Sequence, residues 1–270
     1  MKILVTGRRA EGVEHLVRRG AEFIQGDLGD PQRVRELCRD VEAVVHCAGA
    51  VGLWGRRSEE RLGLWGRYQA FHQGNVLVTE NVVEACLKEQ VRRLVHLSSP
   101  SVYFDGRSHL GLTEEQLPKR FRHPYAATKF LAEQKVFGAQ EFGLEVLALR
   151  PRFVTGAGDM SIFPRLLKMQ RKGRLAIVGN GLNKVDFTSM QNLNEALLSC
   201  LQVSGSALGK VYNISNGTPV PLWDVVNYVM RQMQVPQVTR PTASRRSTKR
   251  RVRYGRDARS RRCRDSACRS

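Results

Sequence analysis

Residues 1–16 read MKILVTGRRAEGVEHL, and the first seven of them decide the fold class. Residues 3–5 are a short apolar run followed by Thr6-Gly7, which is typical of a buried parallel strand that leads into a dinucleotide phosphate loop. Such a loop carries further glycines at short intervals. Here the next glycine is Gly12, and Arg8 and Arg9 follow Gly7 directly. The opening therefore predicts the strand but leaves the phosphate loop incomplete.

Strand and helix patterns alternate along the rest of the chain. "PQRVRELCRD" (31–40) and "NVLVTENVVEACLKEQ" (75–90) have apolar residues at helical spacing. Between such helices we expect strands at Ile3–Val5, Glu22–Gln25, Ala43–His46, Arg93–Leu97, Glu145–Leu149 and Lys210–Ile214. The alternation predicts an α/β fold, a Rossmann-like doubly wound parallel sheet with helices on both faces.

Length and composition limit the class of protein. The chain has 270 residues, enough for a large α/β domain with an added lobe. No run approaches the roughly 18 apolar residues of a membrane span, and the apolar run after Lys2 is too short for a signal peptide, so we expect a cytoplasmic protein. The six cysteines form no C-x-x-C pair, so we expect reduced thiols and no metal site.

The net charge of +19 is concentrated at one end of the chain. Residues 240–270 contain thirteen Lys and Arg against two Asp, and apolar periodicity stops there. Such a segment predicts a disordered basic tail. It leaves open a solvated tail, a product of an altered reading frame, or an arm that binds nucleic acid or an anionic membrane.

A five-residue repeat interrupts the α/β pattern. GLWGR at 52–56 recurs at 63–67, which indicates a local duplication inside a loop rather than a repeat fold. Trp54 and Trp65 either line an apolar substrate pocket near the site or cover the core of their own loop.

The strongest chemical pattern is "SSPSVY" (98–103) followed by "HPYAATKFLAEQ" (123–134). Ser99 ends the strand "RRLVHLSS", at the sheet edge where open α/β folds bind ligands. Tyr125 and Lys129 are four residues apart in a segment that favours helix, so they share one helical face. Pro124 suits the first turn of that helix.

These three groups suit hydride transfer at a carbinol or ketone carbon. Ser99 is expected to donate a hydrogen bond to the substrate oxygen, and Tyr125 to carry the accompanying proton. Lys129 is expected to lower the pKa of the phenol through its positive charge and to hold the nicotinamide ribose.

At these residues the sequence resembles the extended short-chain dehydrogenase/reductases. The resemblance runs from about Phe23 to Val235 and is strongest with 3β-hydroxysteroid dehydrogenases and bacterial 2-alkyl-3-oxoalkanoate reductases. It is carried by VVHCAGAVGLWG (44–55), GNVLVTENVVEAC (74–86), LVHLSSPSVYFDG (94–106), YAATKFLAEQ (125–134), LALRPRFVTGAGD (147–159) and DFTSM (186–190).

The resemblance implies NAD or NADP as cofactor and assigns residues to it. The implied or expected cofactor residues are Gly7, Arg8, Arg9, Asp27, Leu28, Ala48, Gly49, Asn75, Ser98, Pro151 and Val154. Asp27 and Leu28 would contact adenine, and Asn75 would be a structural asparagine. Alternatives remain for two of these, since Asp27 and Asn75 each also suit a helix N-cap. His46, inside an apolar strand, is interpreted as a core histidine.

The chain also departs from the resemblance. Family members place a glycine-rich turn, a helix and a strand between Gly7 and Arg8, and this sequence lacks them. We expect the sheet to close around the loss, with a helix over "AEGVEHLVRRG" (10–20) pointing its amides at a phosphate. Glu11 and Glu14 in its first turns oppose an anion, so weakened cofactor binding is predicted. Arg8 and Arg9 slightly favour NADP.

The sequence thus predicts a dinucleotide-binding domain over 1–150, to which 184–216 return. Residues 151–183 and 217–239 are expected to form a partial substrate-binding lobe, with the tail at 240–270. The expected function is NAD(P)-dependent oxidation or reduction of an apolar, steroid-like or β-keto alkyl substrate, in a possible homodimer. The alternatives are a nucleotide-sugar epimerase or dehydratase of the same fold, and a catalytically impaired binding protein that acts through its basic tail.

Overall fold

A computed structural model describes residues 2–51, 63–159, 162–177 and 179–239 of the chain. Its main sheet has four parallel strands, in the order β3 (Ala43–His46), β4 (Arg93–Leu97), β5 (Glu145–Pro151) and β9 (Lys210–Ile214). All four lie at the positions predicted from the sequence. The parallel α/β prediction is therefore confirmed.

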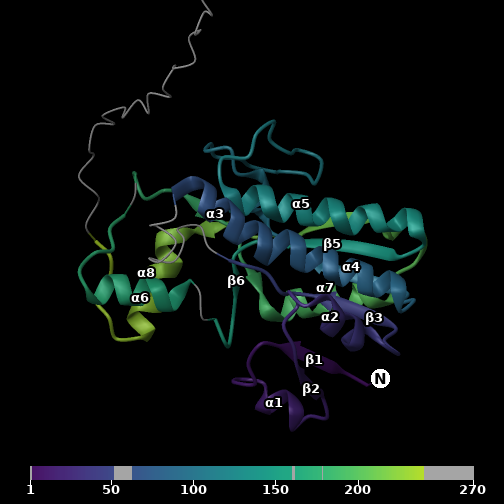
Figure 1. The fold of residues 1–270 in the computed structure, drawn as a ribbon. Helices are drawn as coiled ribbons and strands as arrows, with labels where there is room; N and C mark the ends of the chain where they lie inside the picture. The colour runs from purple at the N-terminus through teal and green to yellow at the C-terminus, as the bar shows by residue number, and fades with distance from the viewer. Residues whose placement is uncertain (1, 52–62, 160–161, 178, 240–270) are drawn as a thin grey trace, which may run out of the picture.

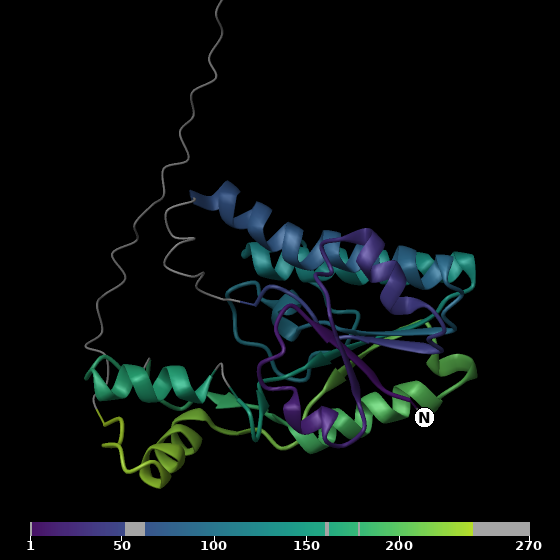
Figure 2. The same cartoon turned by 60° about the horizontal axis from the view of Figure 1, so that its bottom comes forward.

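Helices cover both faces of this sheet. One face carries α2 (Pro31–Cys38), α4 (Val78–Lys88) and α5 (Pro124–Gly138), which surround a core centred on Leu94 and Val146. The opposite face carries α7 (Met190–Gln202), whose Leu193 and Cys200 pack against β4 and β5. Figure 2 shows the sheet between these two helical layers. Because helices cover both faces, β4 and β5 are buried along almost their whole length.

The first unit of the fold is separate from the main sheet. β1 (Leu4–Gly7) pairs in parallel with β2 (Glu22–Gln25), and these two strands form their own sheet beside α1 (Glu14–Val17), at the bottom of Figure 1. The expectation of one sheet that closes around the missing unit is therefore wrong. The reason is that α1 has only four residues and buries none of them, so no helical layer holds β1 and β2 against β3.

The predicted helix over 10–20 is also shorter than expected. Gly12 and Gly20 have φ values of +86° and +91°, in the left-handed region that stops a helix at both ends. Val13, the residue before α1, makes no side-chain capping hydrogen bond. The segment between β1 and β2 is consequently a turn with a single helical turn inside it.

A third apolar cluster lies beside the sheet layers. It packs α6 (Phe163–Arg171) against α8 (Leu222–Gln232), with Trp223 and Met230 at its centre (Figure 1). Two short sheets join this region to the rest: β6 (Val154–Thr155) pairs with β8 (Thr188–Ser189), and β7 (Lys184–Val185) with β10 (Val220–Pro221). Helices α6 and α8 and strands β6 and β10 lie in the segments that the sequence assigns to a substrate lobe, whereas β7 and β8 lie in the returning segment 184–216 of the dinucleotide-binding domain. This division stays a prediction.

The remaining described elements connect the layers. They are α3 (Gly63–Phe71), the π-helical turn η2 (His72–Leu77), and the 3₁₀ turns η3 (Pro100–Tyr103), η4 (Ala139–Phe142) and η5 (Gly205–Ala207). Trp65 in α3 is 72% exposed and stacks on Tyr68, so it does not cover a core. Trp54 and the predicted tail lie outside the described residues. Among the helices that the structure describes, none is long and apolar enough to cross a bilayer.

A buried arginine fastens α7 to the sheet. Arg93 is 2% exposed, and its guanidinium donates to Glu145 of β5 and to the carbonyl oxygens of Cys200 and Val203, at 2.8 and 2.7 Å. The next residue, Arg92, also bonds Glu145 but is largely exposed. The two neighbours therefore make similar ion pairs in opposite surroundings.

We predict that Arg93→Ala lowers the free energy of unfolding by about 3 kcal/mol. The change leaves the carbonyls of Cys200 and Val203 without their donor and removes one positive charge from beside the Glu145 carboxylate. Arg92→Ala, the matched control, should cost at most about 1 kcal/mol, as expected for an exposed ion pair. Urea unfolding of both variants measures the difference. Equal losses would show that burial of Arg93 contributes nothing beyond its charge.

Candidate functional site

The carboxyl ends of β3, β4 and β5 bring the predicted catalytic segments to one edge of the main sheet. Residues 47–50 follow β3, Ser98 and Ser99 follow β4, and Pro151 ends β5. In parallel strands these ends meet at the same edge, which is where open α/β sheets place ligands. Helix α5 runs along this region and supplies Tyr125 and Lys129.

Local sequence sets the position of α5. His123 is the N-cap residue, and its Nδ1 accepts a hydrogen bond from the backbone N–H of Tyr125 at 3.1 Å. Pro124 occupies the first helical position, where its missing N–H costs nothing. Tyr125 therefore lies in the first turn, and Lys129 lies one turn later on the same buried face, as predicted.

Tyr125 and Ser99 are brought together. Burial raises the pKa of the Tyr125 phenol, and a hydrogen bond with Ser99 opposes this increase. The direction differs from the one expected from the sequence, since the charge of Lys129 does not lower the pKa of the phenol here. The reason is that the Lys129 ammonium donates its hydrogen bond elsewhere, at 2.6 Å to the carbonyl oxygen of Leu97.

Lys129 is a buried cation with few partners of opposite charge. It is 4% exposed, and burial lowers the pKa of its ammonium to about 8. The negative charge of Glu133 and the thiol of Cys47 work in the opposite direction and raise that pKa. A lysine in this state is charged at neutral pH and close to losing its proton.

Asn75 joins three segments of the site. Its Oδ1 accepts from the backbone N–H of Ala50 at 2.8 Å, and its Nδ2 donates to Thr128 at 3.0 Å. It lies inside the π-helical turn η2, so the alternative interpretation as an N-cap is wrong. A Cβ on Gly49 would lie 2.9 Å from Asn75 Oδ1 and 3.8 Å from Lys129 Nζ, so only glycine fits there without movement.

The other residues expected near the nicotinamide lie at the same edge. Ser98 is 7% exposed, donates its hydroxyl to Glu133, and its backbone N–H bonds the Leu149 carbonyl at 2.7 Å. Pro151 is buried at the end of β5. Val154 begins β6 and packs against the core under α7. Ala48 is exposed beside Gly49.

The residues expected at the phosphates and adenine lie on the separate first unit. Gly7 ends β1, and the exposed Arg8 and Arg9 follow it. Asp27 accepts from the backbone N–H of Gly29 at 2.9 Å, within a turn. The N-cap of α2 is Asp30, so Asp27 does not cap that helix.

Leu28 provides a direct link from this first unit to the main layers. Its carbonyl oxygen accepts a hydrogen bond from Asn81 of α4 at 2.8 Å, and its side chain packs on the α2–α4 core. Within the described part of the chain, no hydrogen bond joins Gly7, Arg8 or Arg9 to the candidate catalytic edge. The structure therefore brings the residues expected to be catalytic close together, whereas those expected at the phosphates lie apart from them.

Sequence reasoning missed a buried ion pair behind the catalytic residues. Glu133 and Arg150 are each 2% exposed and form two parallel hydrogen bonds, of 2.8 and 2.6 Å. Glu133 lies four residues after Lys129, so its position on the Tyr125 face was available from the helical spacing. Arg150 inside the apolar run of β5 was the second available signal.

Two buried histidines also lie behind the site. His46 bonds Thr79 at 3.0 Å, and burial lowers its pKa to about 3. It is therefore a neutral core histidine, as interpreted from the sequence. His96 faces it on β4, with 5.3 Å between ring centroids. Among the residues that the structure describes, no cluster of His, Cys, Asp or Glu has the arrangement of a metal site.

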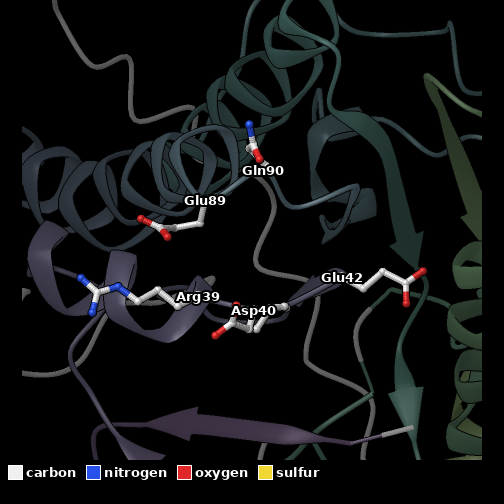
Figure 3. Close-up of a pocket in the computed structure, with 6 residues that line it drawn as sticks. Arg39, Asp40, Glu42, Glu89 and Gln90 are labelled. Carbon is white, nitrogen blue, oxygen red and sulfur yellow. The ribbon is translucent and has the colours of Figure 1, made fainter.

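A hollow of about 510 Å³ lies at the opposite edge of the sheet, before the start of β3. It is lined by Arg39, Asp40, Val41, Glu42, Glu89 and Gln90. Figure 3 shows that the carboxylates of Glu42 and Glu89 point away from each other. Polar groups that do not converge cannot orient a ligand, so we place the candidate site at the carboxyl edge instead.

We predict that Gly49→Ala lowers the free energy of unfolding by about 1 to 3 kcal/mol, because the new methyl group collides with Asn75. The control is Gly138→Ala at the end of α5, where the backbone is helical and no atom lies within 4 Å of the added Cβ. That change should raise stability by up to about 1 kcal/mol. Thermal unfolding of both variants measures this. Unchanged stability in Gly49→Ala would show that Asn75 moves aside freely.

The sequence is similar to those of several reductases and dehydrogenases. The chain is 39% identical over 225 residues to a 2-alkyl-3-oxoalkanoate reductase of Stenotrophomonas maltophilia, a match that covers 81% of this chain and 65% of the relative. A Shewanella oneidensis protein of the same name is 30% identical, with 88% and 62% covered. The human sterol-4-alpha-carboxylate 3-dehydrogenase, decarboxylating, is 31% identical, with 77% and 55% covered. The chain thus spans somewhat less than two thirds of these relatives' lengths.

Solved structures show the same fold. MoeE5 in complex with UDP-glucose and NAD is 27% identical, with a TM-score of 0.71 over 89% of this chain and 85% of that one. The UDP-glucuronic acid 4-epimerase of Bacillus cereus in complex with NAD is 22% identical, with a TM-score of 0.72 over 88% and 78%. The pattern of one family matches residues 1–215. On these grounds the chain belongs to the NAD dependent epimerase/dehydratase family.

Proposed function

We propose that the protein is an NAD(P)-dependent oxidoreductase that reduces a ketone on an apolar substrate through Ser99, Tyr125 and Lys129. The observation that carries this proposal is the contact between Ser99 and Tyr125 at the carboxyl edge of the sheet, with the Lys129 ammonium one helical turn away. Hydride transfer is the chemistry expected of an NAD-dependent family, and these three groups can donate the accompanying proton and stabilise the charge that it leaves.

The electrostatics favour reduction at neutral pH. Burial raises the pKa of Tyr125, so the phenol is protonated and able to donate to a carbonyl oxygen that gains negative charge. Ser99 lies within hydrogen-bonding reach of the phenol, so both hydroxyls can bond the same substrate oxygen. Lys129 is charged below about pH 8, and we propose that its ammonium turns from the Leu97 carbonyl toward the phenolate that remains after transfer and stabilises it.

The residues at the catalytic edge fit the nicotinamide end of the cofactor. Gly49 leaves open the space between Asn75 and Lys129 that a side chain would fill, and this opening suits a closely approaching ring or ribose. Lys129, Pro151 and Val154 would hold that end, whereas the hydroxyl of Ser98, also expected there, donates to Glu133. When bound, the nicotinamide supplies or accepts the hydride.

The residues at the phosphate end fit the cofactor poorly. After Gly7 the chain has arginines where close backbone approach needs glycines, and α1 is a single turn. Arg8 and Arg9 offer charge without that approach, and they favour NADP over NAD. We therefore propose weak cofactor binding.

The substrate class rests on the relatives. Two of them are named 2-alkyl-3-oxoalkanoate reductases and one is a sterol dehydrogenase, and all three names point to apolar substrates with an oxygen at a secondary carbon. The rival is sugar-nucleotide chemistry, since MoeE5 was solved with UDP-glucose and NAD at 27% identity. Higher identity to the reductase favours the apolar substrate. A homodimer, a cytoplasmic location and a role for the tail stay predictions.

Tyr125→Phe should reduce turnover by at least about a thousandfold, within the range expected when a proton donor is lost, while leaving NAD(P)H affinity nearly unchanged. Lys129→Met should damage both, because the ammonium serves the phenol and the cofactor. Steady-state kinetics with 2-alkyl-3-oxoalkanoates, together with NAD(P)H fluorescence titration, separates the two effects. Normal turnover in Tyr125→Phe would show that Tyr125 is not the proton donor.

The incomplete phosphate loop gives a second expectation. The loss of two hydrogen bonds to a charged pyrophosphate, each worth about 1.5 to 3 kcal/mol, weakens binding about a hundredfold or more. We expect dissociation constants in the high micromolar range or weaker. Insertion of a G-x-x-G-x-x-G turn with its helix and strand between Gly7 and Arg8 should restore tight binding. Calorimetric titration with NAD(P) compares the unchanged chain with the insertion variant. Low-micromolar affinity in the unchanged chain would contradict the proposal of weak cofactor binding.

A further inference from the structure

Three consecutive residues at the end of β4 each meet a different residue of α5. Ser99 lies close enough to the Tyr125 phenol to lower its pKa, and the Leu97 carbonyl accepts from Lys129 at 2.6 Å. Between them, the Ser98 hydroxyl donates to Glu133. The three α5 residues are spaced four apart and form one buried row along the helix. The contact between Ser98 and Glu133 thus lies beside the contacts of Tyr125 and Lys129, the two α5 residues that the proposed chemistry uses.

Glu133 is held from the other side by β5. Arg150 bonds both of its carboxylate oxygens and also donates to the Tyr103 hydroxyl at 2.5 Å and to the Glu114 carbonyl at 3.0 Å. Tyr103 in turn donates to Asn213 of β9 at 2.8 Å. The carboxylate is therefore fixed by a network that spans α5, β5, η3 and β9.

We propose that Glu133, held by Arg150, is a positioning residue that fixes the carboxyl end of β4 against α5 and thereby sets the spacing of the candidate catalytic groups. This inference rests on the proposed function of the same site. Glu133 contacts neither the reacting atoms nor the cofactor in this role. It acts through Ser98 and through its charge on Lys129.

The charges around Lys129 define what removal of Glu133 changes. On its own helix the ammonium faces Glu133, and from the β3 side it faces Cys47 and His46, with His96 behind on β4. Both histidines are neutral because burial lowers their pKa values. Glu133 is therefore the main negative charge that keeps Lys129 protonated, and its loss should lower the pKa of Lys129 further.

The first test compares Glu133→Gln with wild type in the pH profile of ketone reduction. We expect a fall in kcat of about tenfold and a shift of the basic limb by about one pH unit toward lower pH. The matched control is Glu80→Gln. Glu80 lies on α4 and pairs with Lys135, which is on α5 like Glu133 but away from the site. The profile of Glu80→Gln should coincide with wild type. An unshifted limb in a folded Glu133→Gln protein would overturn the proposal.

Ser98→Ala provides a second variant that leaves the buried ion pair intact. It should lower kcat several-fold with the pH limb unmoved, because positioning is lost while the charges remain. A change confined to the KM of the cofactor would assign Ser98 to cofactor contact and contradict the positioning role. This variant also decides the matter if Glu133→Gln does not fold.

A measurement without turnover separates this inference from the proposed function. Burial lowers the pKa of Lys129 from its ordinary value of 10.5 to about 8 in the folded protein, so between these values the unfolded chain binds more protons. Stability from this group is therefore complete above about pH 10.5 and is lost as the pH falls through 8. The stability difference between wild type and Lys129→Met should show this window.

In the Glu133→Gln background, the same comparison between Lys129 and Lys129→Met should move the lower limit of this window below pH 8, while the upper limit, set by the unfolded chain, stays near 10.5. An unchanged window would overturn the influence of Glu133 on Lys129. If wild type instead shows no NAD(P)H-dependent turnover with any ketone, the proposed function fails while this comparison still decides the inference.

Discussion

The end of β4 and one face of α5 meet through three successive contacts, and the organisation of the site depends on them. Tyr125, Lys129 and Glu133 repeat at helical spacing, and the strand end opposite them offers a hydroxyl, a carbonyl and a second hydroxyl. Strand β4 ends at Leu97, so Ser98 and Ser99 lie beyond the ladder, where the chain can turn away from the sheet. Ser99 does so, because its hydroxyl caps the 3₁₀ turn η3.

The buried charges near this contact are balanced incompletely. Arg150 and Glu133 neutralise each other. Lys129 has no carboxylate of its own among the residues that the structure describes, and it relies on the Leu97 carbonyl and the more distant charge of Glu133. Burial of an unpaired amine costs stability, and proteins retain such groups where chemistry uses them. The position of Lys129 between a candidate acid and a candidate cofactor pocket fits that pattern.

The first unit of the fold shows what a parallel sheet needs. β1 and β2 pair with good register, yet they form a sheet of their own because the short α1 covers neither of them. Strands in parallel sheets are held by helices on both faces as much as by their hydrogen bonds. The catalytic edge does not depend on this unit, since it is built from β3, β4, β5 and α5. The phosphate end of the proposed cofactor site does depend on it. The nicotinamide half of that site is therefore held by packed elements, and the phosphate half is not.

The sequence alone predicted the strands of the main sheet, the helix that carries Tyr125 and Lys129, and the placement of Ser99 at a strand end. These features follow from local periodicity, from Pro124 in a first turn and from the four-residue spacing of two side chains. The tertiary structure alone decided the separation of β1 and β2, the raised pKa of Tyr125 and the pairing of Glu133 with Arg150. Each of these depends on what lies nearby in space: a missing helical layer, the burial of a phenol, and an arginine seventeen residues further along the chain. Local sequence patterns contain no information on such long-range packing, because burial and charge balance arise only when distant segments meet.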